Sequence, residues 1–143
     1  MTLLQSEVGT YTGKYPNSFA NLYYSPDNTI LEIPTVNREL PETKSLTHLL
    51  SEWDPSSSHY EFVTVERSFK QLNDLLVHIS NGELRGDRTV IEISFDDVDN
   101  ALLLAVDDKA GYREFADIPI VRSLSREYGS ALRFAWWNVV SGN

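Results

Sequence analysis

Apolar and polar positions along the chain follow a helical period in one stretch and a strand period in the next. The clearest helical stretch places five apolar side chains on one face: Phe69, Leu72, Leu75, Leu76 and Ile79. The glycine of Ser80-Asn81-Gly82 suits the position just past a helix C-terminus. We therefore predict an amphipathic helix here, with either Ser68 or Thr64 as its N-terminal cap.

The pattern changes to that of strands beyond this helix. Residues 89–95 alternate apolar and polar positions, as in a strand with one face toward water. Residues 101–106 are continuously apolar and predict a central strand, and a third strand is expected to begin at 112–115. Turn-forming residues separate these runs at 96–100 and 107–111. Three strands joined by tight turns would form an antiparallel meander.

The first 58 residues are rich in turn signals and contain five of the six prolines. Within them, residues 23–33 predict a hairpin around a turn that a proline initiates. Leucines and a tryptophan in residues 46–53 share one face of a short helix, which must end before Pro55. The β-rich residues 60–65 predict a strand that follows this half of the chain.

The C-terminal residues complete the expected fold. A short helical stripe runs from Pro119 to Gly129, and the aromatic and β-branched residues 132–140 predict a last strand. The whole order predicts an α+β fold in a single domain, with a mainly antiparallel sheet, one main amphipathic helix and one or two short helices. Residues 1–58 form its loop-rich part and residues 59–143 its regular core.

Composition narrows the possible functions. The 143 residues carry a formal net charge of -9, 41% hydrophobic residues and no cysteine. The apolar content suits one packed core, and the absence of cysteine excludes disulfides, thiolate metal sites and thiol nucleophiles. A surface this acidic disfavours direct binding to nucleic acid and attracts basic partners. The opening residues lack a basic signal-peptide region and no apolar run is long enough to span a membrane, so we expect a cytoplasmic protein.

The negative charge is concentrated in one tract. Residues 92–117 hold eight acidic and two basic residues, so six of the nine net negative charges lie there. Asp is a common turn residue, which explains these acids without a function. The alternative is a surface that docks a basic partner. On that interpretation the candidate steering charges are Asp96, Asp97, Asp99, Asp107 and Asp108.

Two adjacent tryptophans, Trp136 and Trp137, are the candidate anchors of such a surface. On a strand their rings would point to opposite faces, one into the core and the other outward. Tryptophans are favoured at the centres of protein interfaces. Burial of both rings in a two-sided sheet is the alternative.

No catalytic or metal-binding motif stands out in the sequence. The pair Asp97 and Asp99 lacks the glycine and glutamate of a calcium loop, and the three histidines lack the spacing of helical zinc ligands. Residues 56–58 are serines beside His59, which a polar surface loop explains without chemistry. A spatial pair of carboxylates stays open as a glycosidase-type site. We predict no catalytic residue, no metal and no cofactor.

The part from Ser68 to Trp137 resembles the immunity proteins that neutralise bacterial polymorphic toxins, most nearly those found beside deaminase toxins. The resemblance rests on four features: the helix that opens at Ser68-Phe69-Lys70-Gln71-Leu72, the strand pair at 90–95 and 101–106, the short helix ending in Ser125-Arg126-Glu127-Tyr128-Gly129, and the closing strand 132–137. It implies a toxin-binding protein without catalytic residues.

Charge, size and this resemblance lead to one expected function. We expect an acidic immunity or antitoxin-type protein, a monomer or weak homodimer when free, that covers the active site of a basic toxin domain. Three alternatives remain: a phage-type inhibitor whose acids imitate phosphates, a small enzyme of unrecognised type, and a homo-oligomeric structural subunit.

Overall fold

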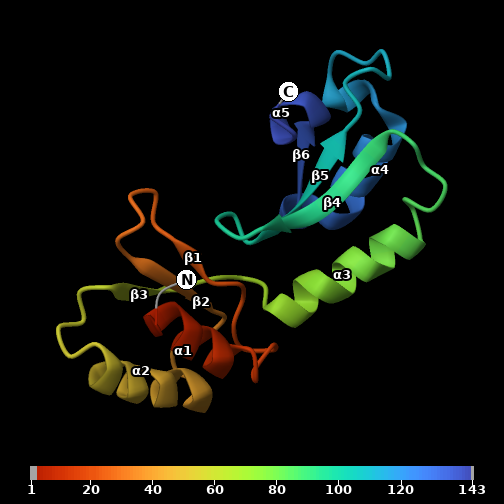
Figure 1. Cartoon of the computed structure of the whole chain (residues 1–143). Coiled ribbons are helices and arrows are strands. Elements are labelled where there is room, and N and C mark those ends of the chain that lie inside the picture. Colours follow the sequence, from red (N-terminus) through yellow and green to blue (C-terminus); the bar gives the residue numbers. More distant parts are fainter. Residues whose placement is uncertain (1–2, 143) are drawn as a thin grey trace. The chain divides into compact units, whose positions relative to one another are not determined.

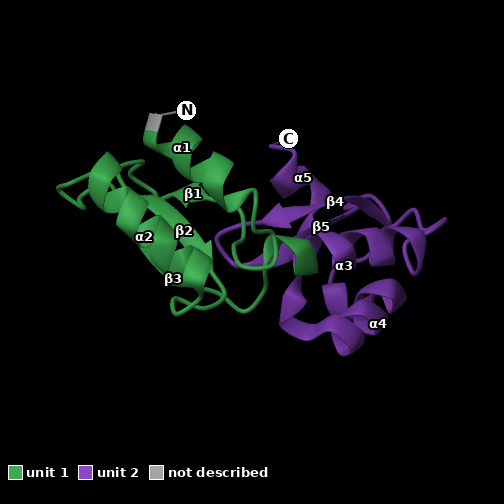
Figure 2. Cartoon of the chain, turned by 90° about the horizontal axis from the view of Figure 1, so that it is seen from below, with its two compact units in different colours: residues 1–71 green, residues 72–143 purple. Residues whose placement is uncertain are grey.

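The computed structural model describes residues 3–142 and shows an α+β fold with mixed sheets (Figure 1). Contacts divide the chain into two compact units, residues 1–71 and 72–143 (Figure 2). The division falls inside helix α3 (Phe69–Asn81), whereas composition placed a break at residue 58. The boundary between the units lies beyond residue 58 because the strand at 60–64 pairs with a strand of the first unit. A single domain for the whole chain stays a prediction.

Unit 1 is a three-stranded sheet with two helices on one face (Figure 1). Its elements are α1 (Leu3–Thr12), β1 (Tyr23–Tyr24), β2 (Leu31–Thr35), α2 (Pro41–Trp53) and β3 (Tyr60–Thr64). The predicted hairpin is confirmed, because β1 pairs antiparallel with β2. The next strand, β3, pairs parallel with β2 after the α2 crossover. The predicted helix and strand at 46–53 and 60–65 are therefore present, and α2 begins earlier than its apolar stripe.

The core of unit 1 lies between the sheet and these two helices. Its fully buried side chains come from α1, the loop after it, β2 and α2: Val8, Phe19, Leu31, Ile33, Leu46 and Leu50. Helix α1 was not predicted, although Leu4, Val8 and Tyr11 recur at helical spacing and pack in this core. Gly9 and the β-branched Thr10 between them weaken the helical pattern in the sequence.

The opposite face of this sheet carries two carboxylates in register. Glu32 of β2 pairs with Glu61 of β3, and one Glu32 carboxylate oxygen is buried with no hydrogen-bond partner among the described residues. Burial raises the pKa of Glu32, and the neighbouring Glu61 adds to the rise through a shared hydrogen bond and its charge. Folding therefore shifts the protonation equilibrium of Glu32 toward the neutral carboxyl, relative to the unfolded chain.

We expect Glu32→Gln to raise the free energy of unfolding at pH 7 by about 0.5 kcal/mol, the scale of a like-charge cross-strand pair. A raised pKa favours folding below the ordinary value of 4.5 and loses that contribution as pH rises through the folded-state value. The gain should therefore disappear at pH 3, where the Glu32 carboxyl of the unmodified chain is protonated and the like-charge pair no longer exists. Urea unfolding at the two pH values measures it, with the exposed Glu7→Gln as control. An equal gain at both pH values would contradict this account.

Unit 2 contains a second three-stranded sheet, in the order β4-β5-β6. After α3 its elements are β4 (Val90–Asp96), β5 (Ala101–Val106), the short 3-10 helix η1 (Phe115–Asp117), α4 (Pro119–Tyr128), η2 (Gly129–Ala131), β6 (Leu132–Trp136) and α5 (Trp137–Val140). Strand β5 is central as predicted, antiparallel to β4 and parallel to β6. The helix α4 supplies the crossover that this parallel pair requires.

The predicted meander and the predicted mainly antiparallel sheet are therefore wrong. Residues 112–114 form a loop, Phe115 already belongs to η1, and β6 takes the place beside β5. Strand β6 occupies this position because its alternate residues Leu132, Phe134 and Trp136 bury their side chains on one face of the sheet. Residues 112–114 are exposed and have no such face. The last strand also ends at Trp136, four residues earlier than predicted.

The main amphipathic helix, α3, matches its prediction closely. Ser68 is the cap, because its hydroxyl accepts the N–H of Gln71 at 3.2 Å and the Gln71 side chain accepts the N–H of Ser68 at 2.8 Å. Leu72 and Ile79 of α3 pack with Leu102, Leu104, Leu124 and Leu132 to form the core of unit 2. Among the described residues, no helix has the length and apolarity needed to cross a membrane.

Candidate functional site

The seven predicted partner-binding residues separate into two groups at opposite ends of β5. Asp96, Asp97 and Asp99 lie at the turn before the strand, and Asp107 and Asp108 follow its last residue. Six extended residues put these ends about 17 Å apart. The five acids therefore do not converge on one point.

The acids before β5 are partly compensated. One Arg133 guanidinium nitrogen from β6 donates to carboxylate oxygens of both Asp96 and Asp99. Asp96 also accepts the backbone N–H of Asp99 at 3.2 Å, which stabilises the turn. The Asp96 side chain is 13% exposed, whereas that of Asp99 is 50% exposed. Much of this group therefore holds β4, β5 and β6 together, as the turn-residue interpretation expected.

The acids after β5 lie beside the tryptophan segment. A carboxylate oxygen of Asp108 accepts the backbone N–H of Asn138, in the first turn of α5, at 3.2 Å. Asp107 accepts the N–H of Lys109 at 2.9 Å in the turn that follows β5. Trp136 pairs in register with Val106, so the chain beyond each residue leaves the sheet at the same end.

Trp136 is a structural residue of unit 2. Its ring stacks on Phe115 with centroids 4.4 Å apart and an interplanar angle of 24°. It also packs against the cluster formed by Val106, Ile118 and Val121. The prediction that both tryptophans lie on the last strand is wrong, because the strand ends at Trp136 and Trp137 begins α5.

The C-terminal helix leaves an apolar surface next to these acids. Trp137 is half-buried, Val139 is 71% exposed and Val140 is 37% exposed. Because Asp108 accepts a hydrogen bond from this helix, the candidate steering charges after β5 lie beside the candidate anchor Trp137. We call this surface, Asp107, Asp108, Trp137, Val139 and Val140, the acidic corner.

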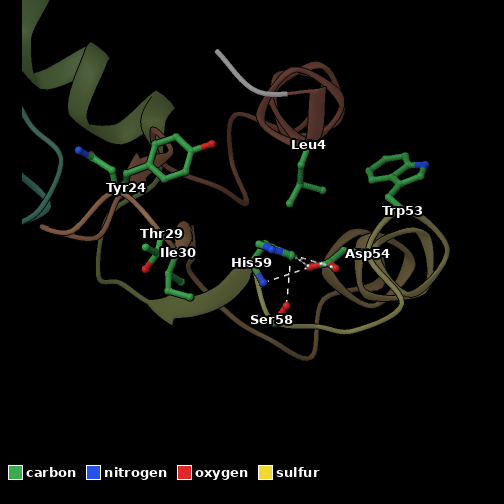
Figure 3. Close-up of a pocket in the computed structure, with 9 residues that line it drawn as sticks. Leu4, Tyr24, Thr29, Ile30, Trp53, Asp54, Ser58 and His59 are labelled. Carbon is green, nitrogen blue, oxygen red and sulfur yellow. Dashed lines mark hydrogen bonds and ion pairs between the residues drawn. The ribbon is translucent and has the colours of Figure 1, made fainter.

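Unit 1 contains a cavity that the sequence did not predict, with a volume of about 680 Å³ (Figure 3). Nine residues from α1, the β1–β2 hairpin, α2 and the loop before β3 line it: Leu4, Tyr24, Asn28, Thr29, Ile30, Trp53, Asp54, Ser58 and His59. Two of them, Ser58 and His59, belong to the tract first explained as a polar surface loop. The spatial grouping of four separate segments left no pattern in the sequence that could have identified the cavity.

Asp54 organises the polar wall of this cavity. Its carboxylate accepts the Ser56 hydroxyl at 2.7 Å and the backbone N–H of His59 at 3.1 Å, and both its oxygens lie 3.2 Å from His59 Nδ1. The Ser56 hydrogen bond, and then those from His59, hold the pKa of Asp54 below its ordinary value. The Asp54 side chain is 9% exposed, and that of His59 is 66% exposed.

No protein-family model matches this chain, and no curated protein matches it. Function is therefore inferred from the geometry of its own residues. Within residues 3–142, no group of three or more histidine, aspartate or glutamate side chains is arranged to hold a metal ion. Both the acidic corner and the cavity combine exposed surface with specific chemistry.

Proposed function

We propose that this chain is an acidic binding protein that inhibits a basic protein, of the immunity or antitoxin type, by covering its active site. The acidic corner is the observation that carries the proposal. It places exposed apolar side chains of α5 beside Asp107 and Asp108, within a tract that holds six of the nine net negative charges. Apolar anchors bordered by charge are typical of protein interfaces.

Charge selects the kind of partner. Negative charge around an apolar centre increases the rate of encounter with a basic surface and opposes an acidic one. Arg133 offsets part of the charge at the other end of β5, so the acidic corner is favoured over the β4–β5 turn as the contact. Trp137 and the two valines would supply affinity through burial, and Asp107 and Asp108 would supply steering and orientation.

The resemblance to toxin-neutralising immunity proteins supports the same proposal. The helix, strand pair, short helix and closing strand on which it rests correspond to α3, β4 with β5, α4 and β6. The strand pair, α4 and β6 lie in unit 2, which also carries the acidic corner.

The product of the neighbouring gene is the partner to test. We expect it to be a basic protein that kills or arrests a host cell when produced alone and is harmless when this chain is produced with it. Purified, the two should form a complex that withstands gel filtration. A neighbouring product that is harmless alone, or a toxic one that stays toxic in the presence of this chain, would contradict the proposal.

The association rate of that complex should fall steeply with ionic strength. Steering by exposed charges is screened over about 8 Å at physiological salt, so we expect a decrease of at least tenfold between 20 and 500 mM NaCl. The dissociation rate should change much less, because it depends mainly on the apolar contacts. Stopped-flow mixing measures both rates. An association rate that stays constant over this range of salt would contradict electrostatic steering by the acidic surface.

A further inference from the structure

The cavity of unit 1 is lined by apolar side chains, by the polar wall around Asp54, and by the polar hairpin residues Asn28 and Thr29. The proposed inhibition does not use this cavity. Figure 3 shows Tyr24 and Trp53 on opposite sides of the cavity, with Leu4 and His59 between them. Ile30 adds a further apolar side chain to the lining. A volume of about 680 Å³ lies in the range of pockets that take up small molecules. Aromatic and aliphatic walls of this kind suit a planar apolar ring system.

Hydrogen bonding determines which nitrogen of His59 carries the proton in the neutral ring. Both Asp54 oxygens lie 3.2 Å from Nδ1. An ionised carboxylate only accepts hydrogen bonds, and the donors around Asp54 keep it ionised. Nδ1 must then donate its proton to Asp54, which leaves a lone pair on Nε2. The His59 ring lines the cavity and is largely exposed, so Nε2 is an acceptor for a bound molecule.

The same geometry argues against a hydrolytic triad. Ser58 Oγ lies 3.3 Å from His59 Nδ1, the nitrogen that also faces Asp54. In a serine hydrolase the nucleophile and the carboxylate bond to different nitrogens of the histidine. Ser58 is also 2.7 Å from the Ser56 hydroxyl and belongs to the network that holds Asp54. The polar wall is therefore suited to binding rather than to acyl transfer by Ser58.

We propose that this cavity is a binding site for an uncharged, planar aromatic molecule of two or three fused rings that donates one hydroxyl or N–H hydrogen bond to His59 Nε2. Tyr24, Trp53, Leu4 and Ile30 contact the ring system. Asp54 is a positioning residue, because it orients the imidazole and fixes its tautomer without reaching the ligand. This site lies in unit 1 and the acidic corner lies in unit 2, so either proposal can fail without the other.

Three naphthalenes test the site on the full chain at pH 7. We use 2-naphthol as the donor, 2-methoxynaphthalene as a ring of similar size without a donor, and 2-naphthoate as an anion. We expect 2-naphthol to bind roughly tenfold more tightly than 2-methoxynaphthalene, the effect of one net hydrogen bond. NMR titration should shift the Trp53 indole N–H and the His59 ring signals together. Equal affinities for the two neutral compounds, or tightest binding of 2-naphthoate, would overturn the proposal.

Variants separate the hydrogen bond from general apolar binding. His59→Phe should lower the affinity for 2-naphthol to that for 2-methoxynaphthalene and leave the latter almost unchanged. The matched control is His48→Phe, since His48 lies on α2 outside the cavity lining and should not alter either affinity. Amide spectra of each variant check that it is folded. If His59→Phe is misfolded, imidazole ¹⁵N shifts of the unmodified chain decide, because protonation at Nε2 in the neutral ring would equally overturn the proposal.

Discussion

Replacement of Trp136 by alanine is expected to lower the free energy of unfolding by about 3 kcal/mol, the scale of a large aromatic deletion from a core. The ring stacks on Phe115 and packs against Val106, Ile118 and Val121, so its loss leaves a gap at the end of the unit 2 core. Residues that pack beside a gap lose dispersion contacts that they cannot recover by small shifts. Urea unfolding followed by circular dichroism measures the change.

The matched control is Trp53→Ala in unit 1. That ring is 36% exposed on the wall of the cavity, and we expect its removal to cost less than about 1 kcal/mol. A similar loss for both tryptophans would contradict the structural role of Trp136. This structural role of Trp136 must be separated from binding before Trp136 or Trp137 is tested as an interface anchor.

Replacement of Trp137 by alanine is expected to weaken binding to the basic partner by at least 30-fold, an effect of about 2 kcal/mol. Trp137 begins α5 after the strand has ended, so its removal should disturb the sheet far less than removal of Trp136. The loss should appear mainly as faster dissociation, because buried apolar contacts resist separation. Surface plasmon resonance with the purified partner measures both rates.

A charge reversal at Asp107 should produce the complementary effect. We expect Asp107→Lys to slow association by about tenfold at low salt and to change dissociation little. Glu7→Lys, an equal charge reversal on the exposed part of α1, is the control and should alter the rate only slightly. A larger effect from Glu7→Lys than from Asp107→Lys would place the contact outside the acidic corner.

Local patterns in the sequence predicted many of the elements. The stripe from Phe69 to Ile79 and the proline-initiated hairpin depend on neighbours within a few residues, and both are present. The parallel pairs were missed because they join strands that lie far apart in the sequence. Turn residues at 107–111 favour a reversal of the chain, but they do not determine which later segment occupies the edge of β5.

The sequence predicted which residue types make up the candidate site, but it did not predict how they are arranged in space. Turn chemistry explains why aspartates lie at both ends of β5, and charge alone favoured a basic partner. Two long-range contacts distinguish the acids at the two ends of β5. Arg133 partly neutralises the acids before the strand through Asp96, whereas Asn138 joins Asp108 to α5 after it. Neither pairing has a signal in sequence spacing. The cavity was missed for the same reason, since four separate segments contribute its walls.

Hydrogen exchange of the full chain, with and without the basic partner, tests the central claim most directly. We expect the partner to slow exchange in the loop around Asp107 and Asp108 and in α5, and to leave the hairpin that lines the cavity unchanged. The amides of Lys109 and Asn138, which bond to these two acids, are the most informative reporters. A toxic basic partner that binds while both segments exchange at their free rates would contradict the acidic corner as the site of inhibition.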